Sequence, residues 1–133
     1  FLLLHGDICI DRGHAAEALE QLVRDGKKWI SRGASVAIFP EGTRSKDPDG
    51  KMLPPKAGIA LIAKATHADV LPACIYFEGK SKFRKKITVR FGEVIPYEEL
   101  GLTDESNMSE IKDASRLVMG KIGELLEKGH EKD

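Results

Sequence analysis

The 133-residue sequence is poor in the residues that mark several specialised classes of protein. It has only two cysteines, too few for a disulfide framework, so we expect a reducing, intracellular setting. Basic and acidic side chains number 21 each, which excludes a polycation that coats nucleic acid by charge alone. No apolar run in the sequence approaches the roughly 18 residues of a membrane span. What remains is the profile of a globular domain, with 41% hydrophobic and 32% charged residues.

The order of apolar patterns predicts an α/β fold with a mixed, largely parallel sheet flanked by helices, in a single domain over residues 1–133. Helices are expected at about 15–32, 57–66 and 108–128, and strands at 8–10, 35–39, 70–77 and 86–94. Gly33 is placed to end the first helix, and Asn107 with Glu110 to cap the last. Apolar and polar residues alternate in 86–94, as in a half-buried strand.

Charge is unevenly distributed along the chain. Residues 51–91 carry nine basic and two acidic side chains, whereas residues 92–133 carry five basic and eleven acidic ones. The middle segment either faces an anionic partner or packs near the acidic C-terminal segment. Its densest part holds Lys80, Lys82, Arg84, Lys85 and Lys86. This part suits an anionic membrane surface or a solvated connection between strands, and without an aromatic platform we expect no nucleic acid.

The most informative stretch runs from the predicted strand 35–39 into Pro40, Glu41 and Gly42. Ligands in open α/β sheets bind where strands end, and glycine lets the backbone approach a ligand closely. The next residues are Thr43, Arg44 and Ser45, which offer two hydroxyls and a planar guanidinium suited to phosphate or carboxylate. Glu41 is placed to hold that guanidinium or to accept a substrate hydroxyl. The alternative is a surface turn with a salt bridge.

A second charged pair, Asp11-Arg12, follows the predicted strand 8–10. If both strands lie in a parallel sheet, their ends share one edge, so we expect Arg12 and Arg44 within about 10 Å of each other. Nucleotide-binding glycine motifs and metal-site spacings are absent from the sequence. Cys9 and Cys74 lie in apolar runs and are expected to be core residues.

Three segments, in order, resemble conserved blocks of the glycerophospholipid acyltransferases, in their 1-acyl-glycerol-3-phosphate acyltransferase form. GDICIDR at 6–12 is similar to the second block, FPEGTRS at 39–45 to the third, and VLPACI at 70–75, centred on Pro72, to the fourth. Lys56 and Gly58 match residues that follow the third block. The resemblance covers roughly residues 6–95.

The resemblance implies an enzyme of phospholipid biosynthesis that moves a fatty acyl group from acyl-CoA or acyl carrier protein to lysophosphatidate, giving phosphatidate. It implies that Arg44 grips the acceptor's phosphate, with Glu41, Gly42 and Thr43 shaping the turn and Arg12 as a second contact. Asp11, Ser45, Lys56 and Pro72 would support the site, and no metal or organic cofactor is expected. The place of action would be the cytoplasmic side of a membrane.

The family's first block, His-x-x-x-x-Asp, supplies the catalytic base, and none of the four histidines fits it. Five positions after His5, His14 and His67 stand Ile10, Leu19 and Pro72, and the chain ends before that distance from His130. Since the sequence opens on Phe1 inside an apolar run, we expect a piece of a longer protein that carries the acceptor-binding half of the site. Two alternatives stay open: an acyltransferase for glycerol-3-phosphate or another lysolipid, and a non-catalytic phosphate- or lipid-binding domain.

Overall fold

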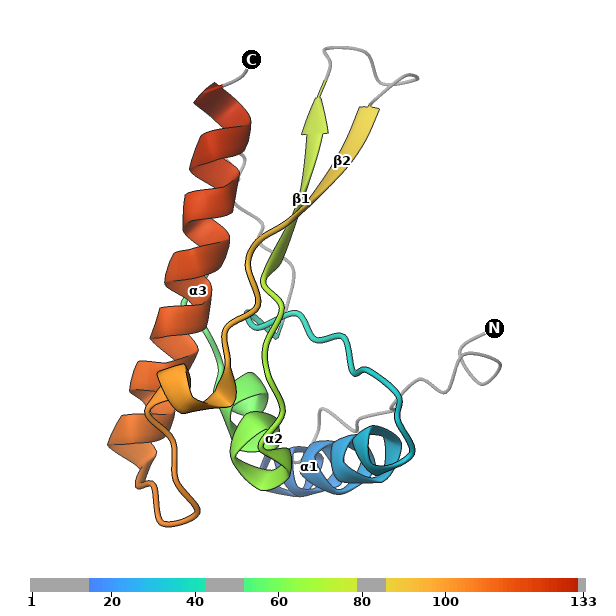
Figure 1. Ribbon diagram of the computed structural model, residues 1–133, viewed down its shortest axis with the longest axis vertical. Helices are drawn as coiled ribbons and strands as arrows, with labels where there is room; N and C mark the ends of the chain where they lie inside the picture. The colour runs from blue at the N-terminus through green and yellow to red at the C-terminus, as the bar shows by residue number, and fades with distance from the viewer. Residues whose placement is uncertain (1–14, 43–51, 79–85, 132–133) are drawn as a thin grey trace.

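The computed structural model describes residues 15–42, 52–78 and 86–131. The elements in these residues are α1 (Ala15–Ser31), α2 (Gly58–Thr66), β1 (Ala73–Glu78), β2 (Lys86–Phe91), the 3-10 turn η2 (Tyr97–Leu100) and α3 (Met108–Glu131). Helix α3 runs beside the β1–β2 hairpin, and α1 and α2 lie together at one end of the molecule (Figure 1). Helices and strands both contribute, in keeping with the α/β expectation.

The expected largely parallel sheet is wrong for the described residues. Strands β1 and β2 pair antiparallel, with Ile75 opposite Val89 and Ala73 opposite Phe91. Only seven residues, 79–85, join the two strands. A parallel pair needs a crossover of a dozen or more residues, so a connection this short permits only a hairpin.

The predicted strand at 35–39 is also corrected, because these residues form no ladder with any described strand. They nevertheless keep a period of two, with Val36 and Ile38 half-buried and Ser35, Ala37 and Phe39 exposed. The segment is therefore extended, with the alternation of a strand but without its hydrogen bonds. The predicted strand at 8–10 lies outside the described residues.

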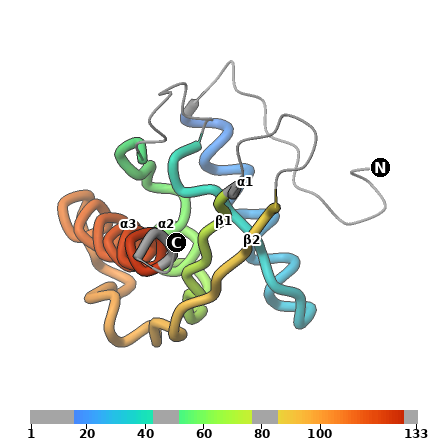
Figure 2. The backbone as a smooth tube through the Cα atoms, turned by 90° about the horizontal axis from the view of Figure 1, so that it is seen from above, coloured from blue at the N-terminus to red at the C-terminus, as the bar shows by residue number. Residues whose placement is uncertain are grey.

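The hairpin exposes the apolar side of β2. The alternation in residues 86–94 had predicted that this side would be the buried one. Ile87, Val89 and Phe91 are exposed, whereas Thr88 and Arg90 are half-buried. Helix α3 lies on the β1 side of the hairpin, as the view from above shows (Figure 2). The polar residues of β2 take the covered side, where the Arg90 guanidinium donates to the Tyr76 hydroxyl (3.3 Å).

Helices α1 and α2 pack closely through two glycines. A Cβ at Gly26 of α1 would lie 3.2 Å from Ile62, and a Cβ at Gly58 of α2 would lie 3.0 Å from Leu22. The main core joins α2 to α3 and the residues between β2 and α3; its members include Ala60, Ala63, Val70, Ile95, Leu100, Ile111, Ala114 and Val118. None of the described helices has both the length and the apolar character to cross a membrane.

The predicted helix ends are confirmed at two places. Gly33 has φ +84° and its N–H donates to the Ile30 carbonyl, which ends α1 in the left-handed conformation that glycine adopts without strain. The Asn107 side-chain oxygen accepts the Glu110 N–H (3.0 Å), so Asn107 caps α3. Buried Ile111, Ala114 and Val118 form the predicted inner face of α3.

Candidate functional site

The residues Phe39 to Gly42 form a tight turn. The Gly42 N–H donates to the Phe39 carbonyl (3.0 Å), with Pro40 and Glu41 between them. Proline at the second position and glycine at the fourth favour such a turn, because proline fixes φ near the value that the second position needs. Gly42 itself has φ +70°, a conformation that a side chain disfavours. The sequence therefore fixes a sharp turn at the point where residues 43–45 follow.

Glu41 ties this turn to a segment twelve residues further along the chain. Its Oε2 accepts the Leu53 N–H at 2.8 Å, in a half-buried setting. Beside it the Lys56 N–H donates to the Pro40 carbonyl (2.7 Å). Two hydrogen bonds thus hold the residues on either side of the 43–51 segment together. This contact gives Glu41 a positioning role that the sequence analysis did not foresee.

Lys56 lies over the turn. A Cβ at Gly42 would stand 3.1 Å from Lys56 Cγ, so the lysine stem occupies the space that any other residue at position 42 would need. The Lys56 side chain is exposed, which leaves its ammonium in solvent next to the turn. Lys56 therefore lies beside Gly42, and its supporting role in a site stays a prediction.

Several predicted site residues lie outside the described residues, and their roles stay predictions. They are Asp11, Arg12, Thr43, Arg44 and Ser45, together with Lys80, Lys82, Arg84 and Lys85 of the basic segment. The expected proximity of Arg12 and Arg44 belongs to this group. Lys86 is described and is exposed as the first residue of β2.

Pro72 is a structural residue of the hairpin. It is buried, and its carbonyl accepts the Gly92 N–H (2.9 Å). A Cβ at Gly92 would lie 3.1 Å from Pro72 and 3.2 Å from Leu125 of α3, so these three residues pack where the hairpin meets α3. The hydrogen bonds that tie Pro40 and Glu41 to Lys56 and Leu53 do not involve Pro72.

Cys74 and His67 show how the remaining reactive side chains are used. Burial raises the pKa of the Cys74 thiol, partly offset by the charge of Arg90, which fits the expected core role. The His67 Nε2 lies 2.7 Å from an Asp104 oxygen, and its ring stacks on Tyr97 with centroids 4.5 Å apart. His67 caps the C-terminal end of α2, whereas Lys56 precedes its N-terminal end. The nine-residue helix, about 14 Å long, therefore separates His67 from Lys56.

Leu53 was not predicted from the sequence, because its contribution is a backbone N–H, which every residue except proline has. A hollow next to Leu53, between residues 52–54 and α3, was not predicted either. Two glycines in one face of a long helix, Gly120 and Gly123, were the available indication of that hollow, because glycine is otherwise disfavoured inside helices.

We expect Glu41→Ala to lower the free energy of unfolding by about 1–3 kcal/mol, because it leaves the half-buried Leu53 N–H without an acceptor. Glu41→Gln keeps an oxygen at this place and should lose less. Urea unfolding followed by circular dichroism measures both changes. Glu20→Ala on the exposed side of α1 is the control, expected within about 0.5 kcal/mol of the wild type. Equal stability of Glu41→Ala and the wild type would contradict the positioning role.

Residues 2–76, more than half of the chain, match the sequence model of the family described as Acyltransferase. The matched region includes the Phe39–Gly42 turn, Leu53 and Lys56. No solved structure matches the chain.

Several curated relatives carry the name 1-acyl-sn-glycerol-3-phosphate acyltransferase. The protein from Cocos nucifera is 38% identical over 63 residues, which are 47% of this chain and 20% of the relative. The protein from Pseudomonas aeruginosa is 41% identical over 71 residues, 53% of this chain and 27% of the relative. A Brassica napus protein, named as chloroplastic, is 47% identical over 51 residues, 38% of this chain and 14% of the relative. The chain thus spans about a quarter or less of these relatives' lengths.

Proposed function

Because the chain belongs to the Acyltransferase family, we propose that it is the acceptor-binding part of an enzyme that acylates the free hydroxyl of 1-acyl-glycerol-3-phosphate. The donor would be acyl-CoA or acyl carrier protein, and the product phosphatidate. The names of the relatives support this acceptor, since the proteins from Cocos nucifera and Pseudomonas aeruginosa are both named for it. The reaction passes an acyl group from a thioester to an alcohol and needs no metal or organic cofactor.

The observation that carries the proposal is the tied turn at Phe39–Gly42. Glu41 and Pro40 are hydrogen-bonded to Leu53 and Lys56, so the backbone that leads into Thr43 and Arg44 starts from a fixed point. Because the turn is already ordered, less of the loop loses conformational freedom when the guanidinium binds a phosphate. The free-energy cost of binding is therefore lower. Holding the phosphate sets the position of the hydroxyl that reacts, which is how positioning contributes to rate.

Arg44 would take the phosphate as a planar, bidentate donor, and Arg12 would add a second contact from the segment after residues 8–10. Lys56, beside Gly42, adds positive charge at the same end of the turn. The basic segment Lys80–Lys86 would lie against anionic lipid head groups, and the reaction would take place at the cytoplasmic surface of a membrane.

The test is a comparison of two ligands that differ only in the phosphate. We expect the chain to bind lysophosphatidate at least about tenfold more tightly than the monoacylglycerol with the same fatty chain, because one charge-assisted hydrogen bond accounts for that ratio. Titration calorimetry below the micelle-forming concentration measures both affinities, and added salt should reduce the difference. Equal affinities would contradict a phosphate-binding acceptor site.

A further inference from the structure

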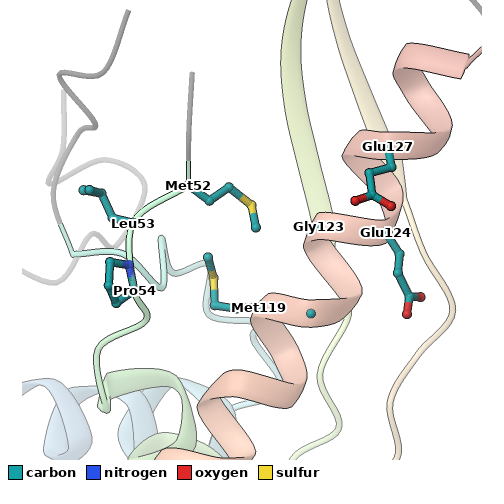
Figure 3. Close-up of a pocket in the computed structure, with 8 residues that line it drawn as sticks. Met52, Leu53, Pro54, Met119, Gly123, Glu124 and Glu127 are labelled. Atoms are coloured by element: carbon teal, nitrogen blue, oxygen red, sulfur yellow. The ribbon is translucent and has the colours of Figure 1, made fainter. Parts of the chain in front are cut away.

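A groove runs along α3 between the helix and residues 52–57. Two hollows form it, and Pro54 lines both, so they lie next to each other. The larger has a volume of about 500 Å³ and contains Met52, Met119 and Gly123. In the close-up, the side chains of Met52 and Met119 point toward each other from opposite walls (Figure 3). The volume lies within the range of small-molecule sites, and the walls are apolar, as in most such sites.

The two ends of the groove differ in charge. The smaller hollow is lined by Lys56, Lys112 and Arg116, and Asp113 offsets part of this charge through its 3.0 Å contact with Arg116. The far end of the larger hollow carries Glu124 and Glu127, on the next turns of α3 (Figure 3).

An anionic group is thus attracted to one end of the groove and repelled from the other. From Lys112 to Glu127 the groove is about 22 Å long at the rise of an α-helix.

We propose that this groove holds the fatty chain of a monoacyl phosphate lipid, with the phosphate at the Lys56–Lys112–Arg116 end and the chain between Met52 and Met119. The inference rests on the proposed function and adds the place of the acceptor's chain. Lys56 joins the two parts, because its stem covers Gly42 of the turn and its side chain also lines the basic hollow. A ligand with one apolar chain next to one anionic group matches the apolar lining of the larger hollow and the basic side chains that line the smaller one.

Gly123 sets the width of the chain-binding part. A Cβ at this position would stand 3.2 Å from the Met52 terminal methyl group, so glycine allows Met52 to pack this closely against α3. A larger side chain at 123 would push the Met52 side chain into the hollow and reduce the space open to the proposed chain. The residue at 123 therefore determines how long a fatty chain can be bound. A substitution there should weaken the binding of shorter chains less, because they need not pass this position.

The exposed face of the hairpin is the competing apolar surface, formed by Ile75, Ile87, Val89 and Phe91. Neither of the two hollows along α3 includes these residues, and Lys86, the first residue of β2, precedes Ile87 at one end of this surface. The groove along α3 combines a lined hollow with basic side chains at one end, which is why the lipid chain is assigned there.

The first experiment measures chain-length dependence in Gly123→Leu. The wild-type chain should bind long-chain lysophosphatidate more tightly than glycerol-3-phosphate. Gly123→Leu should weaken long-chain binding by about tenfold or more, the effect of about two methylene groups kept in water, and leave glycerol-3-phosphate binding unchanged. Lys121→Leu places the same side chain on α3 outside the lining residues and serves as the control. Thermal unfolding checks that each variant is folded.

The second experiment tests the head-group end. Lys112→Gln combined with Arg116→Gln should weaken binding of both phosphate ligands and reduce its dependence on salt, because two positive charges are removed. Lys121→Gln removes one positive charge from the same helix, outside the lining of both hollows, and should change neither affinity.

A third measurement does not depend on the folding of a variant. A lysophosphatidate with a photoreactive diazirine at the chain end should label Met52 or the α3 turn around Gly123. Labelling of the hairpin face at Ile87 or Val89, or a chain-length dependence that survives Gly123→Leu, would overturn the groove assignment while leaving the proposed function intact. Failure of the wild type to bind lysophosphatidate at all would contradict both.

Discussion

The 133-residue chain on its own is expected to transfer no acyl group from acyl-CoA to lysophosphatidate above the uncatalysed rate. The attacking hydroxyl needs a base, and a positioned base is worth about 10²–10⁴-fold. None of the four histidines stands in a His-x-x-x-x-Asp sequence. A continuous assay that detects the free CoA thiol measures the rate directly.

Among the described residues, His67 pairs with the Asp104 carboxylate, and the position of this pair makes it unsuitable as the base. It lies at the C-terminal end of α2, whereas Lys56 and the tied turn are at the other end. His67→Ala is therefore the informative control, because it should not change the measured rate. Turnover by the chain that disappears in His67→Ala would show that this pair acts as the base after all.

Arg44→Lys should weaken lysophosphatidate binding by roughly 10- to 150-fold, although the charge is kept. A lysine ammonium cannot make two parallel hydrogen bonds to a phosphate, and one charge-assisted bond is worth about 1.5–3 kcal/mol. Titration calorimetry with lysophosphatidate measures the affinity of each variant. The effect should be largest at low salt and should persist with glycerol-3-phosphate, which has the same phosphate but no fatty chain.

Arg24→Lys makes the same exchange on the exposed surface of α1 and should leave the affinity unchanged. An Arg44→Lys variant that binds as tightly as the wild type would show that position 44 supplies only charge. The phosphate grip would then have to be sought at Arg12 or at Lys56.

Much of the local structure could be predicted from the sequence. Helices α1, α2 and α3 were predicted within three residues of their ends, because periodic apolar residues, Gly33 and the Asn107 cap are local features. Strand pairing was not predictable in the same way. The alternation in residues 35–39 is real, but whether an extended segment joins a sheet depends on a partner strand elsewhere in the chain.

The candidate site shows the same difference between local features, which the sequence predicts, and tertiary contacts, which it does not. Glu41 and Gly42 were singled out by residue type and motif, and Lys56 by the resemblance to the family. Their mutual arrangement was not predicted, since the Leu53 N–H that Glu41 binds has no residue signature. The groove along α3 was missed because its two walls are about sixty residues or more apart in the sequence and meet only through tertiary packing.

The central claim is that this chain supplies acceptor recognition and a separate block supplies the base. The most direct measurement joins a segment that carries the family's His-x-x-x-x-Asp block to this chain and follows phosphatidate formation from acyl-CoA. We predict transfer to lysophosphatidate at least about 10²-fold above that of the chain alone, with lysophosphatidylcholine, whose phosphate is a diester, a poor acceptor. Equal transfer to both lipids, or none to lysophosphatidate from a folded fusion that contains the block, would contradict the account.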